Sequence, residues 1–166
     1  MSGIAKGRRL SVGLLRDPVH LFALGFGSGL SPWGPGTCGT LLAVPIAVAL
    51  LQVPAPIAWS VVVLAIAVGV WITGESARRL GVHDHSGIVW DEIAAFLGLA
   101  LLLPEGWPWL VAGFILFRIF DIAKPWPIRE MDHSLRGGLG IMLDDLMAAV
   151  YSVVLIKLIN YLATLN

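Results

Sequence analysis

The sequence predicts an all-α fold: a polytopic membrane helical bundle of two apolar hairpins and a final span, with some helices short or re-entrant. Hydrophobic residues make up 57% of the 166 positions and charged residues only 13%, and the mean hydropathy is +0.84. A soluble domain has about 25% charged residues. The apolar residues also form long blocks separated by proline and glycine, as expected of helices that enter a bilayer.

Five apolar segments define the expected helices. Proline and glycine, which disrupt helices, separate the first segment from the second and the third from the fourth by short turns. Crossing a hydrocarbon core of about 30 Å takes about 20 helical residues, and several segments are shorter, so the third is expected to thin the bilayer or to turn back before crossing. The segments are 40–53, 57–73, 93–103, 108–120 and 146–163.

The charge distribution predicts how the chain lies in the membrane. The stretches 1–39, 74–92 and 121–145, with the adjoining helix ends, share one face and hold ten of the 11 Lys and Arg residues. The loops of the other face, 52–56 and 104–108, hold none. Basic residues are retained on the cytoplasmic side, so the first face is predicted to be cytoplasmic.

Composition also limits the partners, the cysteine chemistry and the number of domains that the sequence allows. The formal net charge is zero, so charge gives no support for a nucleic-acid partner. The lone cysteine, Cys38, excludes an internal disulfide and a cysteine-rich zinc site. We find no internal repeat, so residues 1–166 are expected to form a single membrane-embedded domain, and the sequence leaves its oligomeric state open.

Ten of the 11 acidic residues lie on the predicted cytoplasmic face, which the retention of basic residues does not explain. Asp91 and Glu92 begin the third segment, Asp121 ends the fourth, and Asp144 and Asp145 begin the fifth. Because these helix ends share one membrane depth, we infer that the five carboxylates converge. Clustered carboxylates repel unless a cation lies among them, and hard oxygen ligands favour Mg²⁺. The sequence therefore predicts a magnesium site.

Plainer interpretations of the same acids stay open. Asp91 and Asp144 would each serve as an N-cap, where a hydrogen-bond acceptor and a negative charge are favoured. This explanation suits Asp121 poorly, because the helix dipole opposes a negative charge at a C-terminus. Arg118 lies one turn before Asp121 and would form a local ion pair with it.

Candidate phosphate contacts lie in two places. The glycine-rich stretch 25–40 leads into a helix N-terminus, where backbone N–H groups and the helix dipole favour a phosphoryl group. Its glycines and prolines would equally serve to shape the entry into the membrane. Near Asp121, arginine would bind phosphate in bidentate fashion and lysine as a point charge, although anionic lipid head groups are alternative partners. The candidates are Gly36, Thr37, Thr40, Arg118, Lys124 and Arg129.

Four sequence blocks, together and in order, resemble the phosphatidylglycerophosphatase A family. The blocks are GSGLSPWGPGT at 27–37, IVWDE at 88–92, RIFDIAKPWPI at 118–128 and GGLGIMLDD at 137–145. The similarity extends from about residue 20 to about residue 155, and four such blocks in one chain are highly specific.

The resemblance implies a magnesium-dependent phosphatase of the bacterial inner membrane. It would hydrolyse phosphatidylglycerol phosphate to phosphatidylglycerol and inorganic phosphate, a step of phospholipid biosynthesis, at the cytoplasmic face of a multi-pass protein. The expected reaction is attack of water on phosphorus with Asp91 or Asp121 as base, and attack by an aspartate is the alternative.

The residue roles follow from the same similarity and from the reasoning above. The expected metal ligands are Asp91, Glu92, Asp121, Asp144 and Asp145. The expected catalytic residues are Asp91, Asp121, Lys124 and Asp145, and the expected substrate-binding residues are Gly36, Thr37, Thr40, Arg118 and Arg129.

Two other classes of protein compete with this hypothesis. A small ion-coupled transporter would also place ionisable residues in membrane helices, but near the middle of the bilayer. A non-catalytic membrane scaffold would use the charged face to dock partners, and single Asp-to-Asn changes would then have mild effects.

Overall fold

The computed structural model describes residues 10–82, 85–126, 128 and 137–165. Within these ranges every regular element is a helix, so the all-α prediction is confirmed. Short elements η1 (Val12–Arg16), α1 (Pro18–Ala23) and η2 (Gly25–Leu30) come first. The longer helices are α2 (Pro35–Leu50), α3 (Ala55–Leu80), α4 (Trp90–Ala100), α5 (Trp107–Ala123) and α7 (Gly138–Thr164).

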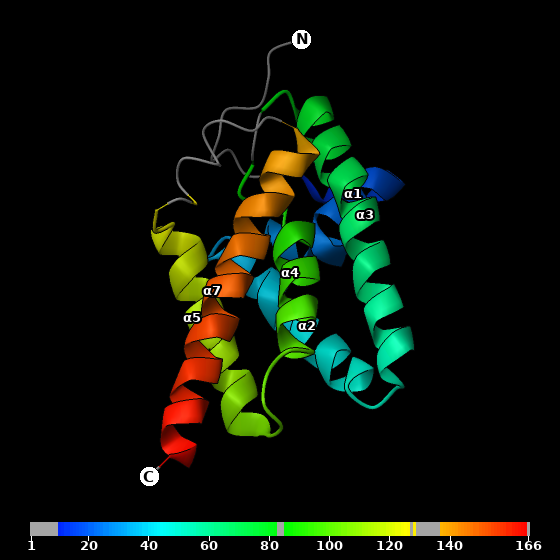
Figure 1. Ribbon diagram of the computed structural model, residues 1–166. Coiled ribbons are helices and arrows are strands. Elements are labelled where there is room, and N and C mark those ends of the chain that lie inside the picture. The colour runs from blue at the N-terminus through cyan, green and yellow to red at the C-terminus, as the bar shows by residue number, and fades with distance from the viewer. Residues whose placement is uncertain (1–9, 83–84, 127, 129–136, 166) are drawn as a thin grey trace.

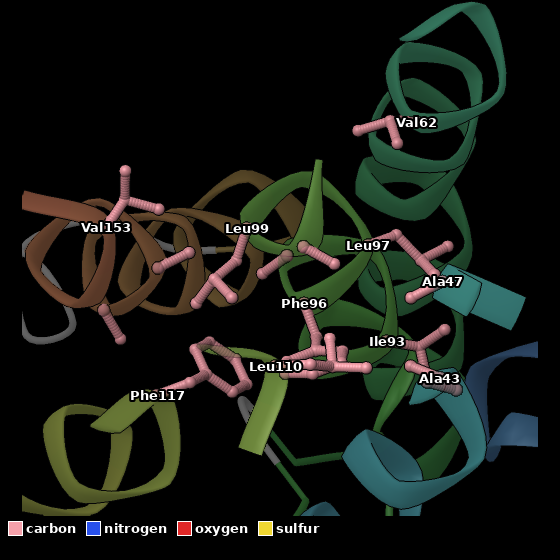
Figure 2. Packing of buried hydrophobic residues seen from close by; sticks show 14 of the residues in the cluster. Ala43, Ala47, Val62, Ile93, Phe96, Leu97, Leu99, Leu110, Phe117 and Val153 are labelled. Carbon is pink, nitrogen blue, oxygen red and sulfur yellow. The ribbon is translucent and has the colours of Figure 1, made fainter. Parts of the chain in front are cut away.

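Helix α4 lies at the centre of the bundle, in contact with α2, α3, α5 and α7 (Figure 1). Apart from Asp91 and Glu92 its sequence is almost wholly apolar, and nearly every residue in it is buried. A helix that is apolar all round is expected to be surrounded by other helices. Figure 2 shows Phe96 of α4 pointing toward Phe117 of α5, and their ring centroids are 6.0 Å apart.

The two predicted hairpins are present. Residues 51–54 connect α2 to α3 and residues 101–106 connect α4 to α5, and both turns lie at the end of the bundle opposite the starts of α4 and α7 (Figure 1). Pro54 precedes α3 as its N-cap residue. Gly106 precedes α5 with φ of 114°, a conformation that favours glycine.

Helices α3 and α7 are long and apolar enough to cross a membrane. Their 26 and 27 residues extend about 40 Å. Helices α2, α4 and α5 have 16, 11 and 17 residues, fewer than the roughly 20 that a perpendicular span needs. Val63, Leu64 and Trp71 of α3 are more than half exposed, and such an apolar surface suits lipid. The chain is therefore a helical membrane protein with several short helices.

The start of α2 differs from the expectation at residue 40. This helix begins at Pro35, after Gly34 in the left-handed conformation with φ of 51°. Proline fits the first turn of a helix, because that turn leaves its backbone N–H groups unbonded in any case. The glycine-rich stretch therefore contributes its last residues to the helix itself.

Two further helix boundaries differ because polar residues continue a helix. Helix α3 runs to Leu80 rather than to residue 73, and Glu75 forms ion pairs with Arg78 and Arg79 along its last turns. Pairs at this spacing stabilise a helix. Helix α7 begins at Gly138, eight positions before the expected residue 146, so it includes both of its aspartates.

Candidate active site

The five predicted carboxylates converge at one end of the bundle. Asp91 and Glu92 lie in the first turn of α4, Asp121 lies in the last turn of α5, and Asp144 and Asp145 lie near the end of the second turn of α7. The negative charges of the other four acids all act on the Asp145 carboxyl. Residues up to 54 positions apart in the sequence thus share one electrostatic environment.

The N-cap interpretation of Asp91 and Asp144 is wrong. Val89 is the N-cap residue of α4, and Gly137 is the N-cap residue of α7. Helix α4 begins one residue before Asp91, and the early start of α7 moves Asp144 well inside the helix. Neither side chain is therefore used as an N-cap.

Three of the five acids form a group that fits a single cation. Asp91, Glu92 and Asp145 are buried, and one carboxylate oxygen from each lies within 4.8 Å of the others. Oε2 of Glu92 and Oδ1 of Asp145 have no hydrogen-bond partner among the described residues. The Glu92 side chain is only 8% exposed, and a buried carboxylate is costly unless a positive charge lies close to it. Buried acceptors are normally satisfied, so a cation would relieve both costs.

The chemistry of this group favours a hard metal ion. All of its ligand atoms are carboxylate oxygens, and within the described ranges neither histidine nor cysteine joins it. Mg²⁺ is typically held by one or two carboxylates together with phosphate oxygens, whereas zinc prefers nitrogen and sulfur ligands. The residues therefore fit Mg²⁺.

Arg118 and Lys124 hold the two remaining acids. Nη1 of Arg118 lies 2.6 Å from Oδ2 of Asp121, so the predicted local ion pair is confirmed. The same Nη1 lies 3.6 Å from Oε1 of Glu92, which extends the pair to the three-acid group. Nζ of Lys124 donates to Oδ2 of Asp144.

Lys124 takes this position from an unusual turn. It is the C-cap residue of α5 and has φ of 42°. The left-handed conformation costs a non-glycine residue roughly 1–2 kcal/mol, and strain of this kind is common at functional sites. From this turn the Lys124 ammonium group forms an ion pair with Asp144, which links the end of α5 to α7.

The predicted phosphate-binding turn lies directly against these acids. A Cβ atom at Gly36 would stand 2.0 Å from Oε1 of Glu92 and 2.9 Å from Nη2 of Arg118, so only glycine leaves room for both. The Thr40 hydroxyl donates to the Gly36 carbonyl oxygen at 2.9 Å and accepts from Arg118 at 3.5 Å. Thr37 lines the surface beside Arg118. Arg129 lies outside the described residues.

Sequence reasoning missed the residues that hold the start of α4 in place. The indole Nε1 of Trp90 donates to the carbonyl oxygen of Ala65 in α3 at 3.0 Å. A Cβ atom at Gly69 would stand 2.9 Å from the Trp90 ring, so this glycine lets the indole lie on α3. The sequence feature that could have indicated this role is the position of Trp90 directly before Asp91.

Fold and site together define a helical membrane protein built around a buried carboxylate centre. The pattern of the phosphatidylglycerophosphatase A family matches residues 21–160. The chain belongs to this family and is a phosphatase.

Three relatives illustrate the similarity. Phosphatidylglycerophosphatase A of Escherichia coli (strain K12) is 45% identical over 89% of this chain and 86% of that protein. Its counterpart in Haemophilus influenzae is 43% identical over 89% of this chain and 91% of that protein. A putative phosphatidylinositol-3-phosphatase of Bacteroides thetaiotaomicron is 40% identical, covering 85% and 92%. No solved structure matches the chain.

Proposed function

We propose that this phosphatase depends on Mg²⁺ and removes the terminal phosphate of phosphatidylglycerol phosphate, giving phosphatidylglycerol and inorganic phosphate. The names of the relatives at 43–45% identity support the substrate. One observation carries the metal dependence: Asp91, Glu92 and Asp145 are buried with carboxylate oxygens within 4.8 Å of one another.

The proposed reaction is an attack of water on phosphorus. The bond between phosphorus and the ester oxygen breaks, and the departing alkoxide takes up the proton that the water loses, so the products are the lipid alcohol and inorganic phosphate. Asp91 accepts the proton of the attacking water, since Arg118 already engages Asp121 at 2.6 Å. Bound Mg²⁺ would neutralise the carboxylates and phosphate oxygens and assist formation of the nucleophile.

Positive groups around the acids bind the phosphate. Arg118 offers a guanidinium group between Asp121 and Glu92, and Lys124, held by Asp144, supplies a second positive charge. Both would stabilise the charge that spreads over the phosphoryl oxygens during transfer. The N-terminal turn of α2, with Gly36 and Thr37, is the third proposed contact, and Arg129 is the fourth.

The proposed location is the bacterial inner membrane, in a multi-pass arrangement with the site on the cytoplasmic face. Among the described residues Arg78 and Arg79 lie at the end of α3, whereas Glu105 lies in the turn between α4 and α5 at the other end of the bundle (Figure 1). Because basic residues are retained on the cytoplasmic side, the arginines at this end support a cytoplasmic location of the acids. The substrate keeps its acyl chains in the bilayer and presents its phosphate at this surface.

Phosphate release by the purified protein tests the proposal. We expect release from phosphatidylglycerol phosphate with Mg²⁺, loss of release with a chelator, and recovery when Mg²⁺ is added back. Phosphatidylinositol 3-phosphate is the comparison substrate, because a relative carries that name, and we expect slower release from it. Full activity in the presence of chelator would exclude the metal, and release from the inositol lipid alone would exclude the proposed substrate.

A further inference from the structure

An apolar groove opens on the outer face of the bundle beside the carboxylates. It has a volume of about 450 Å³ and is lined by Thr37 of α2 and by residues of α5 between Phe114 and Ala123. Ile119 in this groove is 51% exposed and Ile122 is 71% exposed. The lining residues follow one face of α5 for about two and a half helical turns.

The two polar residues of this lining also belong to the candidate active site. Arg118 lies 2.6 Å from Asp121 and 3.6 Å from Glu92, and Thr37 follows Gly36 in the first turn of α2. Nε of Arg118 is buried and has no hydrogen-bond acceptor in the part of the chain that the structure describes. A buried guanidinium donor without an acceptor matches an anionic oxygen, and phosphate is the group that arginine binds best in this way.

We propose that this groove seats an acyl chain of the phospholipid substrate while Arg118 contacts its phosphate. The inference rests on the proposed lipid phosphatase function and adds the path by which the membrane-embedded part of the substrate reaches the site. Groove and ligand match in chemistry, because isoleucine side chains extend about one turn on either side of Arg118 and a phospholipid joins an anionic phosphate to apolar chains.

The proposed role of the groove is to position the substrate, and hydrophobic affinity for the acyl chain contributes little. Hydrocarbon already surrounds a membrane protein, so a lipid chain gains little by leaving the bilayer for an apolar groove. A seated chain instead fixes where the attached phosphate comes to rest, which is the geometric requirement for attack. Filling the groove with a large side chain therefore displaces a long-chain substrate and interferes much less with a short, water-soluble one.

The test compares two substrates and three variants. The substrates are phosphatidylglycerol phosphate with two palmitoyl chains, in lipid vesicles, and its water-soluble dibutanoyl analogue. Ile119→Trp and Ile122→Trp fill the groove, and the second is the safer for folding because the residue is 71% exposed. Val150→Trp is the matched control, since Val150 is 50% exposed on α7 and lies outside the groove.

The expected result is a change in substrate preference. In both groove variants the ratio of kcat/KM for the long-chain substrate to that for the short-chain substrate falls about tenfold or more, a typical effect of altering a substrate pocket, and Val150→Trp keeps the wild-type ratio. If both groove variants also keep that ratio while the wild type hydrolyses both substrates, the groove holds only ordinary bilayer lipid and the inference fails alone. A wild type inactive on both substrates overturns the proposed function instead.

Discussion

At the scale of single residues, the site depends on a few close approaches. The Glu92 carboxylate lies where a side chain at position 36 would otherwise be, and Arg118 touches both Glu92 and Asp121. Asp145 contributes a buried oxygen without a hydrogen-bond partner among the described residues. Buried carboxylates in this arrangement are costly without a cation, so a site for a cation explains why the chain keeps them.

Replacing one carboxylate of the three-acid group should nearly abolish activity. Asp145→Asn removes a charge but keeps the size of the side chain, and we expect a loss of about 100-fold or more in phosphate release, in keeping with loss of a metal ligand or base. The matched control is Glu105→Gln, at an exposed position in the turn at the opposite end, which should keep activity. Wild-type turnover in Asp145→Asn would remove this residue from the site.

Glycine at position 36 should be required for activity. In Gly36→Ala the new methyl group would meet Oε1 of Glu92, so the carboxylate must move, and a displacement of this size costs about 100-fold in rate. The control is Gly98→Ala in α4, where the new Cβ would stand 3.4 Å from Val62 and alanine favours the helix. Both variants would be assayed for phosphate release after their helical content is checked by circular dichroism. Equal activity in the two variants would contradict the assigned role of Gly36.

At the scale of elements, the two long helices meet at a very close crossing. A Cβ atom at Gly138 of α7 would stand 1.7 Å from the carbonyl oxygen of Val70 and 2.8 Å from the backbone N of Gly74, both in α3. Small residues at helix crossings let backbones approach closely in membranes. This contact fixes where α7 begins, and it therefore also fixes the position along the bundle of Asp144, which lies in the second turn of α7.

A methyl group at this crossing should destabilise the protein. We expect Gly138→Ala to lower the free energy of unfolding by about 1–3 kcal/mol, the usual cost of overpacking, and to lower the Tm measured in detergent. Leu139→Ala is the control, because Leu139 is 51% exposed in the same turn and surface changes are usually small. A Tm in Gly138→Ala as high as that of the control would show that α3 and α7 separate without cost.

At the scale of the whole molecule, basic residues and the carboxylates of the candidate active site lie at the same end of the bundle. The two turns, 51–54 and 101–106, lie at the other end (Figure 1). In the proposed location, a lipid phosphate at the membrane surface meets the acids and the basic residues together, and the groove extends along α5 from that end.

This difference between the two ends of the bundle predicts which residues are accessible from each side of the membrane. In a Cys38→Ser background, a membrane-impermeant maleimide added to intact cells should label Glu105→Cys and leave Arg78→Cys unlabelled. Arg78 has a side chain that is 73% exposed, so it should react as soon as the cells are opened. Labelling of Arg78→Cys in intact cells would place the site on the outer face and contradict the proposed location.

Much of this protein was predictable from local features of the sequence. Long apolar blocks determine helices, prolines and glycines determine the turns, and the positions of Asp91, Asp121 and Asp145 at the same end follow from the alternation of direction between hairpin helices. Helix starts were predicted less well, since Pro35 and Gly138 begin helices inside stretches rich in glycine, and glycine normally indicates a helix end.

The sequence by itself determined an all-helical membrane protein, its family and the set of acids at one end, because hydrophobicity and residue order along a chain are local properties. Only the tertiary structure decided that Asp91, Glu92 and Asp145 form the three-acid group while Arg118 and Lys124 hold the other two acids. The physical reason is that distances between helices depend on how they pack, and here a short central helix and close contacts at glycine set those distances.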